Sequence, residues 1–304
     1  MGTPARLTAA AQPAKPHAAL ADVPKTVAQW LAWMYALGLD RLDAQLLLLH
    51  ALGRPETERA WLLAHDTDPL PCAAGESLRA LALRRVEGEP LAYITGQKEF
   101  FGLLLAVDAR VLVPRPDTET LVEWALDALP SQPAPPTDRQ IHAIDLGTGS
   151  GAIALALKAT RPQWDVTALD FSTDALAVAR ANATRLSLDI RFRQGAWLEG
   201  ISERFDLIVS NPPYIAANDR HLAALTHEPL QALASGTDGL HDIRSIVTQS
   251  VGRLQPGGWL LLEHGYDQAA AVCLLLREAD FENVQSRNDL AGIARCSGGR
   301  WGLI

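Results

Sequence analysis

Cysteine is scarce in this chain of 304 residues, and the three that occur, Cys72, Cys273 and Cys296, stand far apart. An odd number at wide spacing excludes a disulfide framework and the short repeats of a zinc site. We therefore expect reduced thiols, a cytoplasmic location and no metal centre.

The sequence also lacks long hydrophobic runs and an excess of positive charge. No apolar stretch reaches membrane-spanning length, and residues 1–23, rich in Ala and Pro, have no continuous apolar segment for a signal peptide. The formal net charge of −8 argues against a surface that binds duplex nucleic acid, because such binding depends on many Lys and Arg contacts to phosphates. We expect neither a membrane nor a nucleic acid as partner, although a local basic patch and a basic protein partner both stay compatible with this charge.

The first third of the chain has a helical pattern. After a flexible tail at 1–24, apolar residues recur at helical spacing over 25–95, in short segments that end at Gly38, Gly53 and Gly88. Short helices with short links predict a small helical bundle. We expect this domain to dock a partner.

A β-hairpin connector is predicted next, at 96–117, with the hairpin itself over 100–107. Asp117 or Thr118 would then cap a helix over 119–129, because the apolar positions of that segment share one face. A polar, proline-rich connector follows at 130–139.

Residues 118–304 alternate between strand and helix patterns, which indicates an α/β fold with a mostly parallel sheet covered by helices on both faces. The predicted strands are 141–145, 165–170, 188–193, 206–210 and 258–263, with a closing β pair at 281–287 and 292–302. The predicted helices are 151–160, 173–186, 238–254 and 267–279.

The corner Ser210-Asn211-Pro212-Pro213-Tyr214 comes directly after a buried strand. Two successive prolines stiffen the chain as it leaves the sheet. Such a corner can aim two acceptors, the Asn211 side-chain oxygen and the Pro212 carbonyl, at one –NH2 group, which has two protons to donate. Tyr214 adds an aromatic face. A carboxamide or the exocyclic amine of a base fits this pattern, whereas a plain turn is the structural alternative.

A glycine-rich loop, Gly147, Gly149 and Gly151, lies between a predicted strand and helix. Asp145, two residues before it, would repel a pyrophosphate and attract an ammonium group, and Asp170 ends the next strand, placed for ribose hydroxyls. A ligand with an ammonium, a ribose and no phosphate is S-adenosylmethionine. A NAD site and a purely structural loop are the alternatives; no Lys follows the glycines, which excludes a P-loop.

With these motifs, the chain resembles class I S-adenosylmethionine-dependent methyltransferases that modify nitrogen. More narrowly, it resembles the HemK/PrmC family, the protein-(glutamine-N5) methyltransferases of peptide-chain release factors. The resemblance covers roughly 25–304 and implies a Rossmann-like methyltransferase domain. Its specific stretches are VLVPRPDTE (111–119), DLGTGSGAIALAL (145–157), IVSNPPYI (208–215), EPL (228–230) and LLLEHG (260–265).

The resemblance also implies roles for single residues. The substrate glutamine would be held by Asn211, Pro212, Pro213 and Tyr214, with Asn211, Pro212 and Tyr214 as the catalytic set. The cofactor would be held by Asp145, Gly147, Thr148, Gly149, Ser150, Gly151, Asp170, Trp197 and Asn211. Trp197 would lie near the adenine; the family commonly has an acid just before it, where this chain has Ala196, so a carboxylate contact to the adenine amine from that position is not expected.

The mechanism that we expect is positioning of a weakly nucleophilic amide. Asn211 and the Pro212 carbonyl would orient the –NH2 towards the sulfonium methyl and stabilise the positive charge that develops on nitrogen. Tyr214, with Phe100 of the hairpin, would pack on the glutamine side chain. Arg115 would brace the substrate loop, a helix cap or surface salt bridge being the alternative.

The predicted partner is a peptide-chain release factor, and the predicted state is a monomer. Other functions fit parts of the pattern. Glutamine methyltransferases of a large-subunit ribosomal protein share the Asn-Pro-Pro-Tyr corner, as do adenine amino-group methyltransferases of DNA or RNA. A cofactor-binding protein without catalysis is a further alternative.

Overall fold

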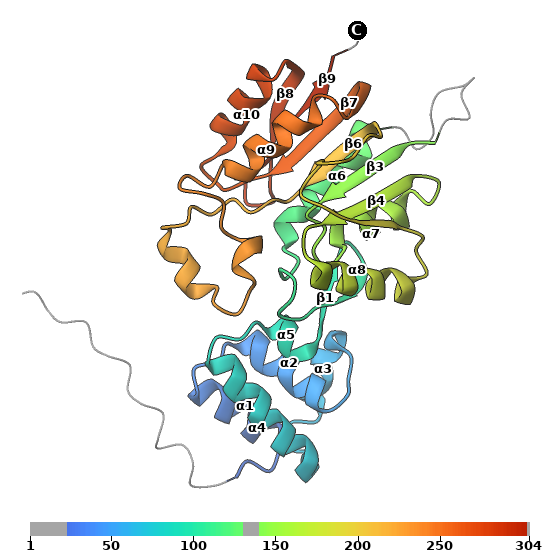
Figure 1. Ribbon diagram of the computed structural model, residues 1–304. Coiled ribbons are helices and arrows are strands. Elements are labelled where there is room, and N and C mark those ends of the chain that lie inside the picture. Colours follow the sequence, from blue (N-terminus) through green and yellow to red (C-terminus); the bar gives the residue numbers. More distant parts are fainter. Residues whose placement is uncertain (1–22, 130–139, 303–304) are drawn as a thin grey trace, which may run out of the picture. The chain divides into compact units, whose positions relative to one another are not determined.

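The computed structural model describes residues 23–129 and 140–302. The predicted connector at 130–139 and nearly all of the predicted tail lie outside the described residues. The chain divides into two compact units, of which the first ends at Thr95 and the second begins at Gly96 (Figure 1). The predicted hairpin therefore falls in the second unit.

The first unit is helical, as predicted. Thr26 starts it with a capping box, since its hydroxyl accepts from the Gln29 N–H while the Gln29 side chain accepts from the Thr26 N–H. Its core includes the buried Trp30, Trp33 and Leu78. Its helices are α1 (Val27–Ala36), α2 (Arg41–Ala51), η1 (Glu56–Glu58), α3 (Arg59–Ala64), α4 (Cys72–Val86) and α5 (Leu91–Thr95). The last of them, α5, was not predicted.

The described residues of the second unit form a seven-stranded sheet in the order β5-β4-β3-β6-β7-β9-β8. The first five strands in this order are parallel, while β9 runs antiparallel to β7 and β8 antiparallel to β9. The strands are β3 (His142–Leu146), β4 (Asp165–Asp170), β5 (Arg191–Gln194), β6 (Phe205–Ser210), β7 (Leu254–Glu263), β8 (Phe281–Asn288) and β9 (Ala294–Trp301). The predicted mostly parallel sheet and its closing β pair are confirmed.

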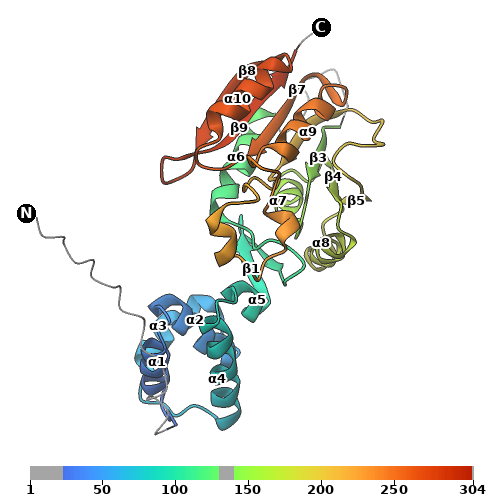
Figure 2. The same ribbon diagram turned by 60° about the vertical axis from the view of Figure 1, so that its left-hand side comes forward.

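Helices cover both faces of this sheet (Figure 2). In β6, Leu207 and Val209 pack with α6, α7 and α8, whereas Ile208 between them packs with α9 and α10. This alternation follows from the two-residue period of a strand. The helical segments are η2 (Pro116–Thr118), α6 (Glu119–Ala128), α7 (Ala152–Thr160), α8 (Thr173–Leu186), η3 (Arg220–Ala224), η4 (Leu230–Ala232), α9 (His241–Ser250) and α10 (Ala269–Glu278). No helix in the described part of the chain is long and apolar enough to cross a membrane.

The hairpin was predicted over 100–107 and begins three residues earlier. It consists of β1 (Gln97–Phe100) and β2 (Leu103–Ala106) around a two-residue turn in which both residues, Phe101 and Gly102, have positive φ. The fully buried Asn182 of α8 fixes the hairpin to the rest of the second unit. Its side-chain oxygen accepts from the Ala106 N–H at 2.7 Å, and its amide nitrogen donates to the carbonyls of Ala106 (3.0 Å) and Ser150 (2.9 Å). One amide thus joins the hairpin, α8 and the glycine loop.

The start of α6 differs from the prediction. Thr118 occupies the cap position, but its side chain makes no capping hydrogen bond, and a short 3-10 turn that includes Asp117 precedes the helix. The Thr118 hydroxyl instead accepts from the side-chain amide of Asn211. The Thr118 hydroxyl was predicted to cap the helix, but it bonds to Asn211, 93 residues away in the sequence.

The sheet is packed so closely at Gly298 that adding a single methyl group there should lower the stability of the fold. A β-carbon at Gly298 of β9 would lie 2.5 Å from Leu261 Cδ2 and 2.7 Å from the Leu260 carbonyl oxygen. We expect Gly298→Ala to lower the free energy of unfolding by about 1–3 kcal/mol, because the Leu260 carbonyl belongs to the backbone of the sheet and cannot move aside easily. Urea unfolding followed by circular dichroism measures this loss.

The matched control is Gly252→Ala, where a β-carbon would meet no heavy atom within 4 Å. The control should stay within about 0.5 kcal/mol of the wild type. Equal effects of the two substitutions would contradict the packing argument.

Candidate active site

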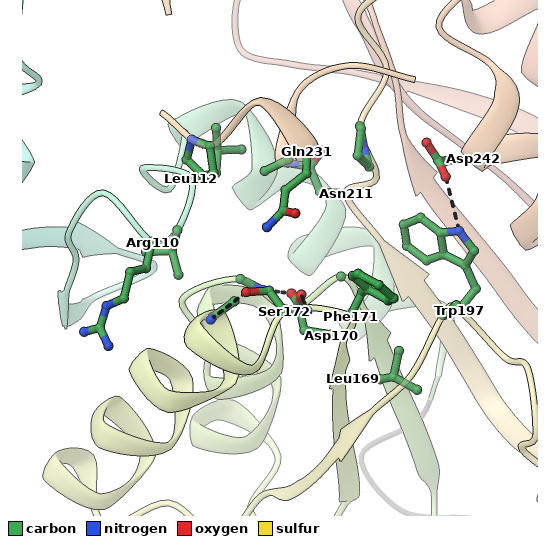
Figure 3. Close-up of a pocket in the computed structure, with 18 of the residues that line it drawn as sticks. Arg110, Leu112, Leu169, Asp170, Phe171, Ser172, Trp197, Asn211, Gln231 and Asp242 are labelled. Carbon is green, nitrogen blue, oxygen red and sulfur yellow. Dashed lines mark hydrogen bonds between the residues drawn. The ribbon is translucent and has the colours of Figure 1, made fainter. Parts of the chain in front are cut away.

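The three strands that carry the predicted motifs, β4, β3 and β6, are neighbours and parallel, so their carboxyl ends meet at one edge of the sheet. Chain order reverses at β3, and such a switch point is where open α/β sheets bind ligands. A cavity of about 350 Å³ opens there (Figure 3). Residues that line it include Arg110, Leu112, Gly147, Gly149, Asp170, Phe171, Ser172, Trp197, Asn211, Pro213, Gln231 and Asp242.

The glycine loop forms the floor of this cavity. Gly147, Gly149 and Gly151 all have positive φ, a conformation that a side chain disfavours. A β-carbon at Gly149 would meet nothing within 4 Å, so this stretch of backbone lies open to a ligand. Thr148 and Ser150 are buried and do not line the cavity.

Asp170 lines the cavity where β4 ends. Its two carboxylate oxygens accept from the backbone N–H groups of Gly149 (2.8 Å) and Ser172 (2.9 Å), which fixes its orientation. Burial raises the pKa of Asp170, while these hydrogen bonds lower it. Each carboxylate oxygen keeps a further lone pair for a ligand hydroxyl.

Asp145 lies below the glycine loop, fully buried and off the cavity wall. Its Oδ2 accepts from the Thr148 hydroxyl (2.6 Å) and the Ala154 N–H (3.2 Å), whereas Oδ1 is buried without a hydrogen-bond partner among the described residues. Burial raises the pKa of Asp145 to about 7. The structure therefore places Asp145 behind the cavity wall, where the prediction expected a direct contact with a ligand.

Trp197 has a positive φ of 54° and lays its indole ring over Gly147, where a β-carbon would come within 3.3 Å of the ring. The indole N–H donates to Asp242 Oδ1 at 3.2 Å (Figure 3). Asp242 also lines the cavity. A carboxylate from α9 therefore lies beside the tryptophan, although none precedes it in the sequence.

The Asn-Pro-Pro-Tyr corner forms another part of the wall. Asn211 and Pro213 line the cavity, and the Asn211 side-chain nitrogen donates to the Thr118 hydroxyl at 3.2 Å. This bond uses the donor end of the amide and leaves its oxygen as an acceptor. The Tyr214 hydroxyl lies 3.4 Å from a carboxylate oxygen of Glu263, and burial beside that acid raises the pKa of Tyr214.

Four predicted substrate residues do not line the cavity: Phe100, Arg115, Pro212 and Tyr214. Phe100 is 1% exposed and packs in the core with Leu105 and Trp124, so it does not line the cavity. Arg115 forms an ion pair with the buried Glu228, which also accepts from the Val113 N–H. Phe100 is thus a core residue, and its predicted contact with the substrate is not supported by the structure. Arg115 joins its own loop to the loop that contains Glu228.

Several residues that line the cavity were not predicted from the sequence, among them Arg110, Gln231 and Asp242. Each stands in a loop or at a helix start, where the sequence carries no periodic signal. Arg110 and Gln231 directly flank the VLVPRPDTE (111–119) and EPL (228–230) stretches, whereas Asp242 is distant from every recognised motif.

Comparisons with known proteins agree with this architecture. A family model described as the methyltransferase small domain matches residues 126–285, and one described as the PrmC N-terminal domain matches residues 22–96. A release factor glutamine methyltransferase from Bordetella pertussis is 52% identical over 266 residues, which cover 86% of this chain and 95% of the relative. One from Burkholderia pseudomallei is 48% identical over 288 residues, covering 91% and 96%. The chain belongs to the release factor glutamine methyltransferase (HemK/PrmC) family.

Membership of this family makes the chain a methyltransferase, as predicted. The crystal structure of a methyltransferase from Pyrococcus furiosus is similar with a TM-score of 0.50 at 18% identity, covering 73% of this chain and 98% of the other. That likeness supports the fold alone. Within the family, the open glycine loop and Asp170 fit a nucleoside cofactor.

The buried Asp145 predicts a pH-dependent stability. A carboxyl group whose pKa is raised on folding adds stability below its unfolded value near 4 and loses it as the pH rises through about 7. Asp145→Asn keeps an acceptor for Thr148 and Ala154 but has no charge to bury. We therefore expect the stability of D145N relative to wild type to rise between pH ~4 and ~7 and then level off.

Urea unfolding of both proteins without ligand, at several pH values, measures this difference. The new buried –NH2 group adds a constant offset, which the comparison across pH removes. A difference that does not change with pH would contradict the raised pKa.

Proposed function

We propose that this enzyme methylates the side-chain amide nitrogen of the glutamine in the Gly-Gly-Gln motif of peptide-chain release factors. The observation that supports this most is the Asn211 amide, which faces the cavity with its nitrogen already bonded to Thr118 and its oxygen available. An acceptor held in this way suits a substrate –NH2 group. The names of the relatives support the release factor as the protein substrate.

S-adenosylmethionine is the cofactor that we propose, and it supplies an electrophilic methyl group on a sulfonium sulfur. Gly147 and Gly149 would support it on their backbone, Asp170 would accept from its ribose hydroxyls, and Trp197 would lie beside its adenine. Thr148, Ser150 and Gly151 would act indirectly by shaping the loop. Asp145 would add negative charge below the loop.

The protein's contribution to the reaction is positioning and electrostatics. The Asn211 oxygen and the Pro212 carbonyl would accept the two amide hydrogens, which aligns the nitrogen lone pair with the methyl group and stabilises positive charge on nitrogen. Tyr214 and Pro213 would pack beside the glutamine. No side chain of the cavity needs to act as a strong base, because the nitrogen sheds its proton to water after transfer.

We also propose that the first unit docks the release factor, that the protein acts as a monomer and that it lies in the cytoplasm, where cysteines such as Cys72, Cys273 and Cys296 stay reduced. The rival substrates are a large-subunit ribosomal protein and the adenine of DNA or RNA, since both offer an –NH2 group to the same corner. Labelled methyl transfer with a release factor, that ribosomal protein and DNA offered side by side separates the three.

Removing the proposed acceptor provides the direct test. We expect Asn211→Ala to lower kcat by about 10²–10³-fold, because the –NH2 group loses an acceptor that acts in the transition state. Asn218→Ala is the matched control, since Asn218 is exposed in the loop that follows. Mass spectrometry of a release factor incubated with each variant counts methyl groups on the Gly-Gly-Gln peptide.

N218A should match the wild type. The proposed function fails if the wild type adds no methyl to that glutamine, and the proposed role of Asn211 fails if N211A stays within about threefold of the wild type.

A further inference from the structure

The Trp197 indole is part of the cavity wall, and its backbone adopts a conformation that few residues with large side chains take. Trp197 stands in the turn after β5 with a φ of 54°, in the left-handed region that favours glycine. Its ring lies over Gly147, and both residues line the cavity. A strained backbone of this kind persists only where neighbouring contacts hold it, so the contacts of Trp197 identify what fixes the ring.

Helix α9 supplies contacts to this turn at two points. Asp242 and Gln249 stand seven residues apart in α9, a spacing that places both on one face of the helix. Asp242 Oδ1 accepts from the Trp197 indole N–H at 3.2 Å (Figure 3), and the Gln249 side-chain oxygen accepts from the Leu198 N–H at 2.8 Å. Gln249 therefore fixes the backbone of the turn, and Asp242 fixes the direction of the ring.

Asp242 is itself tied to the Asn211–Tyr214 corner. Its backbone N–H donates to the Ser235 hydroxyl at 2.9 Å, and the Ser235 N–H donates to the Ile215 carbonyl at 2.9 Å. Ser235 is 1% exposed, and Ile215 directly follows the corner. These hydrogen bonds join the cavity wall at Trp197 to the corner on the substrate side.

We propose that Asp242 is a positioning residue that holds the Trp197 indole over the glycine loop, as a fixed wall against which the cofactor binds. The indole has a single N–H donor, and Asp242 is its acceptor. A ring that is fixed before the ligand arrives has no rotamer freedom to lose on binding, which favours affinity. The proposal rests on the proposed function, because it takes the ligand of this cavity to be the cofactor.

Asp242→Asn and Asp242→Leu test the hydrogen bond. The asparagine oxygen can still accept from the indole, whereas leucine has no acceptor, and both variants lose the same charge from the first turn of α9. We expect the Kd of S-adenosylhomocysteine, measured by isothermal titration calorimetry, to rise about tenfold in D242L and to stay within about threefold of the wild type in D242N. Equal Kd values for the two variants would overturn the proposal.

The same comparison in a Trp197→Phe background separates positioning from any other role of Asp242. Phenylalanine keeps an aromatic ring but has no N–H, so the residue at 242 has no donor to hold. We expect W197F/D242N and W197F/D242L to bind S-adenosylhomocysteine with Kd values within about threefold of each other. A larger difference in this background would mean that Asp242 acts on the ligand or on the fold without Trp197, and it would overturn the proposal.

A measurement without ligand keeps the two hypotheses apart. In protein labelled with 5-fluorotryptophan, the 19F resonance of Trp197, assigned by its loss in W197F, should be the same in the wild type and in D242N. In D242L it should shift or broaden, because the ring is free to change rotamer. An unchanged Trp197 resonance in D242L overturns the proposal whatever the cavity binds, whereas a wild type that does not bind S-adenosylhomocysteine overturns the proposed cofactor.

Discussion

The parallel alignment of β4, β3 and β6 is the constraint on which the site depends. Because these strands are adjacent and run in one direction, the residues that follow Leu146, Asp170 and Ser210 emerge at the same edge. A hydrogen bond from the Ser210 hydroxyl to the Leu146 carbonyl (2.7 Å) fastens two of these ends together. Motifs more than 60 residues apart thereby share one cavity.

Around this edge the enzyme gathers carboxyl groups at different depths. Asp170 stands at the cavity wall, Asp145 below its floor and Glu263 behind the proline corner. Burial raises the pKa of each. Negative charge held in low dielectric is costly for the free protein. Ionising these carboxyl groups therefore lowers the stability of the folded chain.

Much of this fold could be predicted from the sequence. The bounds of β4 and α8 match the prediction residue for residue, since both combine clear periodicity with sharp ends, and Ser172 caps the helix as such residues do. The short helix α5 was missed because five residues hold too little of a helical period. The glycine loop, Asp170 and the Asn211 corner were recognisable because tight turns and chemical roles restrict the residue types.

What the sequence could not supply were contacts between distant segments. Thr118 looked like a helix cap, and only the fold brings Asn211 to its hydroxyl. Phe100 was predicted to pack on the substrate glutamine, and only packing against α6 places it in the core. Asp242 was not predicted as a site residue, and only its hydrogen bond from Trp197 reveals its place beside the cavity. Rules based on neighbours in the sequence cannot predict such contacts. In each of these three cases, a residue from a distant segment determined what the side chain contacts.

The buried amide of Asn182 restricts which side chains this position can hold. Its oxygen accepts from β2, and its nitrogen donates to β2 and to the loop after β3. The side chain at this position must therefore have both a donor and an acceptor. Aspartate has no proton to donate there, and leucine would leave all these backbone groups unsatisfied. Either substitution would therefore loosen the base of the hairpin from the glycine loop after β3.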